Sequence, residues 1–312
     1  MKIQSRVLML LILLVGCARQ QPTGTDAQTP IAGSELDDAA WAEALIDHRE
    51  EIDEEFRSSS TSPMAGTQYL KSEPRDPIYL TRQERTFELT EAAEPAAVLV
   101  AERKEGAWHW ESLAEDVVCE IDGEQVASGS TLEDPATFSI AGLHLSFYPG
   151  EDRVTFIVFD PERPEMKSFD HLLYYPPDRG YAVQAKLVKL PEPDEIEMLT
   201  SRDLKKTFYR YARIQFQVDG KDQELTAFKS ALTGEGSEGL FIPFRDSTTS
   251  RETYGAGRFL EIDEPEAEHF VLDFNRAFNP LCNYSPAYNC AIPPRENHLD
   301  VAIRAGELTY PH

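Results

Sequence analysis

The chain has 312 residues, with 30 Lys and Arg against 55 Asp and Glu, so its formal net charge at pH 7 is −25. A surface this acidic repels phosphate backbones and anionic lipid headgroups, and we therefore expect no nucleic-acid partner. It also disfavours anionic ligands, unless a basic pocket is hidden locally. The length allows one large domain or two modest ones.

Residues 1–16 read as a signal peptide. Lys2 and Arg6 precede the apolar run VLMLLILLVG, which is too short to span a membrane comfortably and is followed by Cys17. The ending LVGC resembles the lipobox of bacterial lipoproteins, and this resemblance implies cleavage before Cys17 and lipid attachment there. Ala18 follows, where an Asp would indicate inner-membrane retention, so the outer membrane is favoured if the cell has one. The alternative is an ordinary secretory signal with a chance Cys.

The next two segments read as a tether and a helix. Residues 17–33 are polar, with Pro and Gly and no periodicity, which predicts a flexible tether. Residues 34–58 predict an amphipathic helix, with Ser34 as its cap and Asp37 at the capping-box position. Its apolar stripe, at spacings of three and four, consists of Trp41, Leu45, His48, Ile52 and Phe56. With a net negative mature chain, the membrane is reached through the lipid on Cys17 and not through the protein surface.

The rest of the chain reads as β structure. From about Tyr79 short runs alternate with period two, separated by turns rich in Gly, Pro and Asp. We predict a mainly β protein with antiparallel sheets, sandwich or barrel-like, in a first β unit at 62–180 and a second at 181–312. The segment VDGKDQEL, residues 218–225, predicts a hairpin.

Three cysteines remain besides Cys17. Cys119 lies in the run DVVCEI and is expected to be a buried strand thiol. Cys282 and Cys290 share a loop rich in Asn and Pro, and an exported location would permit a disulfide between them. The rival is a metal site, but two Cys without nearby His make only half of a zinc site, so we expect no metal.

Two predicted strands before this loop suggest a further pairing. The runs GRFLEID and HFVLDFN flank EPEA, which predicts a hairpin that places Arg258 opposite Asp273, with Asn275 on the same face. Arg258 could then hold Asp273 ionised through a bidentate pair. A structural ion pair and a ligand-site role are both open at this point.

The C-terminal block as a whole resembles a known family. The stretches FIPFRDSTTSRETYGAGRFLEI and FVLDFNRAFNPLCNYSPAYNCAIPPRENHLDVAIRAGE are similar to the family called domain of unknown function 1684. The matching positions are Asp246, Thr248, Thr253, Tyr254, Gly257, Arg258, Asp273, Asn275, Asn279, Cys282, Cys290, Pro293, Pro294 and Asn297. Ser250, Phe278 and Ala291 depart from the family pattern. The resemblance implies a shared fold and surface, but it brings no reaction.

Three functions are compatible with this sequence. The favoured one is a lipid-anchored envelope module that binds an unidentified small molecule or protein, without a cofactor. The alternative is an envelope hydrolase that uses a carboxylate from Asp246, Asp273 or Glu307, although no catalytic set is defined by spacing. In the third, the block is purely architectural. The candidate ligand or partner surface is Asp246, Tyr254, Arg258, Asp273, Asn275, Asn279 and Asn297.

Overall fold

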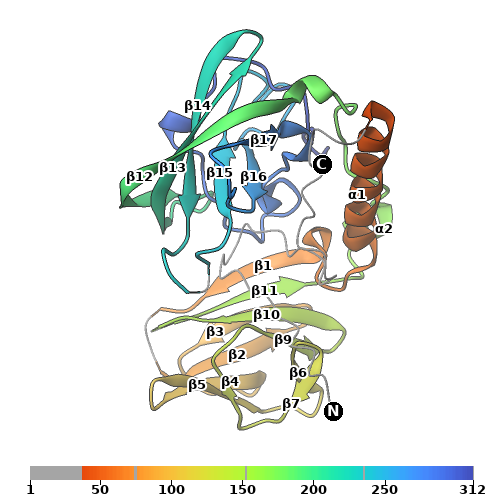
Figure 1. Cartoon of the computed structure of the whole chain (residues 1–312). Helices are drawn as coiled ribbons and strands as arrows, with labels where there is room; N and C mark the ends of the chain where they lie inside the picture. The colour runs from red at the N-terminus through yellow and green to blue at the C-terminus, as the bar shows by residue number, and fades with distance from the viewer. Residues whose placement is uncertain (1–36, 74–75, 152, 235, 312) are drawn as a thin grey trace, which may run out of the picture. The chain divides into compact units, whose positions relative to one another are not determined.

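The computed structural model describes residues 37–73, 76–151, 153–234 and 236–311 (Figure 1). The protein is mainly β, with antiparallel sheets and an N-terminal helix, as predicted. The expected signal peptide, the tether, Cys17 and Ser34 lie outside the described residues. In the described part of the chain, no helix is long and apolar enough to cross a membrane.

The chain forms two compact units. The central unit contains residues 53–171 and 284–289, and the C-terminal unit contains residues 172–283, those from 290 onward, and the described residues up to 52. The boundary thus lies nine residues before the position 180 that the sequence suggested, and six residues of the Asn-rich loop belong to the central unit. Period-two patterns locate strands, but they do not show with which strands a connecting loop packs.

The helix α1 (Asp38–Ser58) belongs to both units. The predicted stripe is confirmed, because Trp41, Leu45, Ile52 and Phe56 are buried and His48 is half-buried. The N-cap is Asp37, whose Oδ1 accepts the backbone N–H of Ala40 at 2.9 Å. The helix therefore begins about one turn after the predicted position.

The central unit is a β-sandwich. One sheet has the order β1-β11-β10-β9-β6-β7 and the other the order β3-β2-β4-β5-β8. The strands are β1 (Gly66–Lys71), β2 (Ile78–Gln83), β3 (Thr86–Thr90), β4 (Ala97–Lys104), β5 (Ala107–Ser112), β6 (Val117–Ile121), β7 (Glu124–Val126), β8 (Thr131–Leu132), β9 (Ala136–Ile140), β10 (Leu143–Pro149) and β11 (Val154–Phe159). The short elements are η1 (Pro63–Ala65) and α2 (Pro164–Ser168).

Both sheets contribute to one apolar core in this unit. Trp110 of β5 meets Phe138 of β9 edge to face, with ring centroids 5.1 Å apart. Cys119 is a buried free thiol of β6, as expected, and burial raises the pKa of this thiol to about 12.

The C-terminal unit contains a half-barrel sheet with the order β16-β15-β14-β13-β12-β17. Its strands are β12 (Ala182–Leu199), β13 (Lys205–Val218), β14 (Lys221–Lys229), β15 (Leu240–Phe244), β16 (Arg258–Ile262) and β17 (His269–Asp273). Short helical turns are η2 (Arg179–Tyr181), η3 (Phe274–Arg276), η4 (Leu281–Asn283) and η5 (Arg295–Asn297). The predicted hairpin is confirmed at the β13–β14 turn, where Asp219 and Gly220 have φ values of 53° and 70°. Both turn residues thus adopt the left-handed region that the Asp-Gly pair tolerates.

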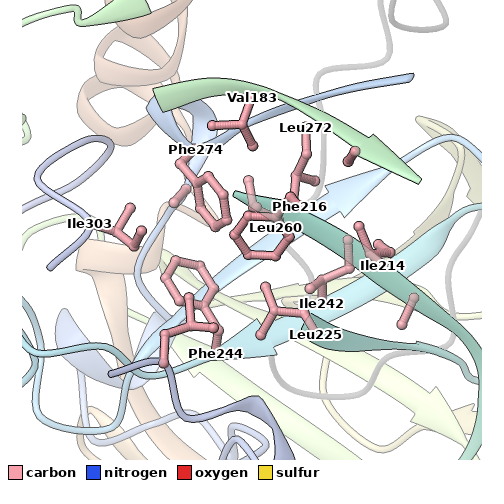
Figure 2. Close-up of a cluster of buried hydrophobic side chains, with 14 of the residues drawn as sticks. Val183, Ile214, Phe216, Leu225, Ile242, Phe244, Leu260, Leu272, Phe274 and Ile303 are labelled. Carbon is pink, nitrogen blue, oxygen red and sulfur yellow. The ribbon is translucent and has the colours of Figure 1, made fainter. Parts of the chain in front are cut away.

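The core of this unit shows that the sheet curls. Leu260 of β16 and Leu272 of β17 lie in one buried cluster, although these strands form opposite edges of the sheet (Figure 2). Phe274 belongs to the same cluster and packs against Phe216 and Phe244, at centroid distances of 5.3 and 5.5 Å. Curvature of the half-barrel turns the side chains of both edge strands toward one core.

The predicted β16–β17 hairpin is wrong. Arg258 pairs with Phe244 of β15, and Asp273 pairs with Ala182 of β12. Residues 263–268 therefore connect the two edges of the curled sheet and do not form a hairpin turn. Alternation fixed the buried face of each strand correctly, but it carries no information on which strand lies beside it.

Candidate functional site

Arg258 is the most deeply buried charged side chain of the family pattern, at 1% exposure. Its guanidinium donates to the carbonyl oxygens of Ile303, at 2.7 Å, and of Ala305. It lies 3.5 Å from Asp246 Oδ2 and stacks 5.2 Å from the ring centroid of Phe244. Burial lowers the pKa of Arg258, and the charge of Asp246 opposes this shift. Asp246, not Asp273, is thus its partner, because β16 and β17 are not neighbours.

Both oxygens of the Asp246 carboxylate accept hydrogen bonds from groups of the protein itself. Its Oδ2 accepts the backbone N–H of Ile303 at 2.6 Å, and its Oδ1 accepts the hydroxyl of Thr248 at 2.8 Å and that of Thr249 at 3.2 Å. Together with Arg258, these contacts tie the turn after β15 to the C-terminal segment. Such a carboxylate has no free lone pair to offer a substrate.

A nearby glycine of the family pattern has a backbone role. Gly257 has φ of 99°, and a Cβ there would lie 2.5 Å from the carbonyl oxygen of Phe244. Only Gly allows this close approach directly before Arg258.

Asp273 and Asn275 form a helical cap. Asp273 Oδ1 accepts the backbone N–H of Asn275 at 2.9 Å and its side-chain Nδ2 at 2.8 Å. The Asn275 amide also exchanges two hydrogen bonds with the backbone of Asp178, at 2.8 and 3.0 Å. Arg49 of α1 donates to the carbonyl oxygen of Asn275 at 3.3 Å. These contacts hold the segment before β12 against the end of β17.

Asn279 and Glu307 brace the loop that follows. The backbone N–H of Asn279 donates to Glu307 Oε2 at 2.8 Å, and its Nδ2 donates to the carbonyl oxygen of Leu308 at 2.7 Å. Asn279 and Glu307 are 2% and 1% exposed. Phe278 adds two backbone hydrogen bonds to Phe259 of β16. The loop therefore covers the outer edge of the sheet.

Tyr254 and the two cysteines are adjacent. The Tyr254 hydroxyl donates to the carbonyl oxygen of Cys282 at 3.1 Å and lies 3.6 Å from its Sγ, and burial raises the pKa of Tyr254. Cys282 is a free thiol, so the expected Cys282–Cys290 disulfide is not formed in this structure. The Sγ of Cys290 instead accepts the backbone N–H of Cys282 at 3.2 Å, while the Cys282 thiol lies against Tyr254. The two sulfur atoms therefore contact the Tyr254 hydroxyl and the backbone N–H of Cys282.

The side chain of Asn297 bridges the backbones of β14 and β15. Its side-chain amide exchanges two hydrogen bonds with the backbone of Thr226, at 2.8 and 2.9 Å, and donates to the carbonyl oxygen of Pro243 at 2.7 Å. Among the described residues, strands β14 and β15 are paired only at Phe228 and Phe241. Asn297 therefore fills the gap where these two strands diverge.

The candidate residues thus fall into separate structural roles. Asp246 and Arg258 lie together, Asp273 and Asn275 form a cap, and Tyr254, Asn279 and Asn297 each brace a different segment. None of the seven lines the open cavity beside β12.

That cavity is a groove of about 370 Å³ in which Lys186–Lys189 of β12 face Pro265–Glu268 of the connection between β16 and β17. The β12–β17 ladder ends at the Lys186–His269 pair, with one further hydrogen bond from Leu187 N–H to the carbonyl oxygen of Glu268, at 2.7 Å. The strand and the connection separate beyond this point. The sequence patterns did not identify this groove, although its charges stand in DEPEAE, where Glu alternates, and in AKLVKL, which contains Lys186 and Lys189.

Comparisons with known proteins agree with the resemblance seen in the sequence. Residues 167–308 match the family described as protein of unknown function, DUF1684. The solution structure of an uncharacterized protein from Haloarcula marismortui is 37% identical over 48% of this chain and 83% of that chain, with a TM-score of 0.40. No curated protein matches the chain. Through its C-terminal segment the chain belongs to the DUF1684 family.

Proposed function

We propose that this chain is an exported binding module of the cell envelope, anchored to a membrane by lipid on Cys17. The support for export is the order of basic residues, short apolar run and LVGC in the first 17 residues. Ala18 favours the outer membrane if the cell has one. Because the protein surface is acidic, the acyl chains provide the attachment.

The observation that carries the binding role is the contrast between the family-pattern residues and the groove. The polar groups of Asp246, Arg258 and Asn297 are engaged by the protein itself. The groove beside β12, in contrast, is open, and its volume lies within the range of small-ligand sites, about 300–1,000 Å³. The ligand is therefore bound at the groove, and the family pattern builds the scaffold that presents it.

The hydrolase alternative gains nothing from this geometry. Asp246 is saturated by donors, Asp273 caps η3, and Glu307 holds the loop at Asn279. None of these three carboxylates lines the groove.

The anchor is tested by metabolic labelling of the full chain with a palmitate analogue. The wild-type chain is expected to carry the label and to fractionate with membranes, and Cys17→Ala is expected to lose both properties. A labelled Cys17→Ala chain, or an unlabelled wild-type chain, would contradict the anchor.

The binding role is tested separately, on the chain from Ala18 onward, which contains every described residue. A small-molecule fragment library would be screened by backbone amide NMR. We expect shifts clustered at residues 186–189 and 265–268. Shifts clustered around Arg258 and Asp246, or no hits at all, would contradict the groove as the binding surface.

A further inference from the structure

The groove has basic residues on one wall and acidic residues on the other. The connection between β16 and β17 carries Glu264, Glu266 and Glu268, and the sheet beneath it carries Lys186 and Lys189 of β12. Lys186 Nζ lies 2.9 Å from Glu268 Oε1, and Lys189 pairs with Glu264. All the cations come from the sheet and all the carboxylates from the connection.

Glu264 lies in a carboxylate site assembled from three strands. Besides Lys189 of β12, it meets the Nζ of Lys229 of β14 at 2.6 Å and the hydroxyl of Tyr211 of β13 at 2.7 Å. Lys229 is only 7% exposed, and its Nζ lies 4.3 Å from the ring centroid of Tyr211. A buried ammonium, a second lysine and a phenol directed at one carboxylate form a recognition geometry for carboxylates.

The backbone is irregular at this place in the sheet. Tyr211 has no ladder partner, because the β13–β14 register shifts between Arg210 and Ala212. The β12–β13 register shifts as well, between Lys189 and Asp194. Bulges of this kind redirect side chains and are frequent beside functional sites.

The two walls of the groove differ in secondary structure: one is a paired strand and the other is a connection. Lys229 and Lys189 lie in ladders, paired with Tyr209 and Ala212. Glu264 lies in a connection outside any strand, in which residues 266–268 are exposed. An exchange of partners would therefore move the carboxylate and leave the cations in place.

From this geometry we infer that Lys189, Lys229 and Tyr211 form a carboxylate subsite beside the groove, which Lys189 also lines, and that Glu264 occupies this subsite here as an internal ligand. The ligand is a small molecule or peptide side chain with a carboxylate, which replaces Glu264. The inference rests on the proposed binding function and names its ligand class. It also supplies the local basic pocket that a chain of net charge −25 needs to bind an anion.

The test uses the chain from Ala18 onward and glutarate, which reproduces the Glu side chain and adds a second carboxylate for Lys186. Affinity is measured by calorimetry, and the site is located by amide NMR. Glu264→Gln removes the internal competitor and is expected to bind glutarate about tenfold more tightly than the wild-type chain. Adding Lys229→Met to Glu264→Gln is expected to abolish binding.

Asp263→Asn is the matched control. It makes the same change of charge in the same connection, but Asp263 is exposed, lies outside the groove lining and makes none of the contacts of Glu264. Its glutarate affinity is expected to equal that of the wild-type chain. An equal gain in both variants would mean that net charge alone sets the affinity, and the inference would be overturned.

Two further outcomes are decisive. If folded Glu264→Gln binds no glutarate, the cluster is a structural ion pair only and the inference is overturned. The proposed binding function would still stand if the fragment screen found ligands in the groove whose binding does not depend on Lys229. A blocked Glu-Pro-Glu peptide is titrated in parallel. Tighter binding of the peptide than of glutarate would assign the carboxylate to a peptide, and the reverse order to a free acid; both orders support the subsite.

Discussion

Asp246 and Glu264 are both carboxylates of the C-terminal unit paired with cations, but their surroundings differ. The Asp246 and Arg258 side chains are each 1% exposed, and Arg258 also donates to the backbone carbonyls of Ile303 and Ala305. The Glu264 side chain is 23% exposed, and its partner Lys189 also lines an open groove. A pair enclosed by backbone contacts can only hold the fold together, whereas a pair beside a groove can exchange one partner.

The largest effect is expected from Arg258→Met. It leaves the Asp246 carboxylate buried without its cation and removes the donor to Ile303 and Ala305. The free energy of unfolding, measured by urea denaturation, should fall by about 3–5 kcal/mol. Arg304→Gln is the control, because its pair with Glu252 is exposed and should contribute less than about 1 kcal/mol. Similar losses in the two variants would remove the distinction between buried and exposed pairs.

The next largest effect is expected from Asn297→Ala, which should lower the free energy of unfolding by about 3 kcal/mol. The substitution removes three side-chain hydrogen bonds and leaves the buried backbone groups of Thr226 and Pro243 without partners. Thermal unfolding would measure the loss. A variant as stable as the wild-type chain would show that Asn297 does not support the sheet, and its place in the family pattern would then need a ligand.

The pH dependence of stability tests the Glu264 cluster. Burial alone would raise the pKa of Glu264, but hydrogen bonds from Lys189, Lys229 and Tyr211 outweigh it and lower this pKa to about 2. The folded pKa lies below the unfolded one, so the ionised side chain contributes stability that is present above about pH 4.5 and lost as the pH falls toward 2.

The expected difference between the wild-type chain and Glu264→Gln is at most about 3 kcal/mol at neutral pH, and it should shrink below pH 4.5. Urea denaturation at several pH values would measure it, with Asp263→Asn as the control for charge. A difference that stays constant from pH 6 to pH 3 would contradict the contacts of Glu264.

The smallest effect is expected from Asp273→Ala. As the cap of η3, Asp273 should contribute about 1 kcal/mol to stability. Had it been the partner of Arg258, its removal would cost as much as Arg258→Met. Comparison of the two variants by urea denaturation therefore tests the pairing that the structure gives Arg258.

The sequence predicted local features of the fold well. The helix stripe, the Asp219–Gly220 turn and the mainly antiparallel β class depend on neighbouring residues, and the structure confirms all three. The position of β16 and β17 at opposite edges depends on the strand order of the whole sheet, which alternation does not encode. The prediction of an Arg258–Asp273 pair was wrong for this reason.

The proposed site was not predicted from the sequence. The family pattern identified the residues that the fold uses internally, such as Asp246 and Asn297. Lys189, Lys229 and Glu264 are far apart in the chain, and the register of β12, β13 and β14 brings them together. Sequence patterns show the charges, but only the sheet shows which of them meet.

The most direct test measures the free energy of unfolding and the glutarate affinity together, for Arg258→Lys and Lys229→Met in the Glu264→Gln background. The account predicts that Arg258→Lys lowers stability and leaves the affinity unchanged, whereas Lys229→Met abolishes binding. Loss of glutarate binding in a folded Arg258→Lys variant, or normal binding after Lys229→Met, would contradict the assignment of scaffold and site.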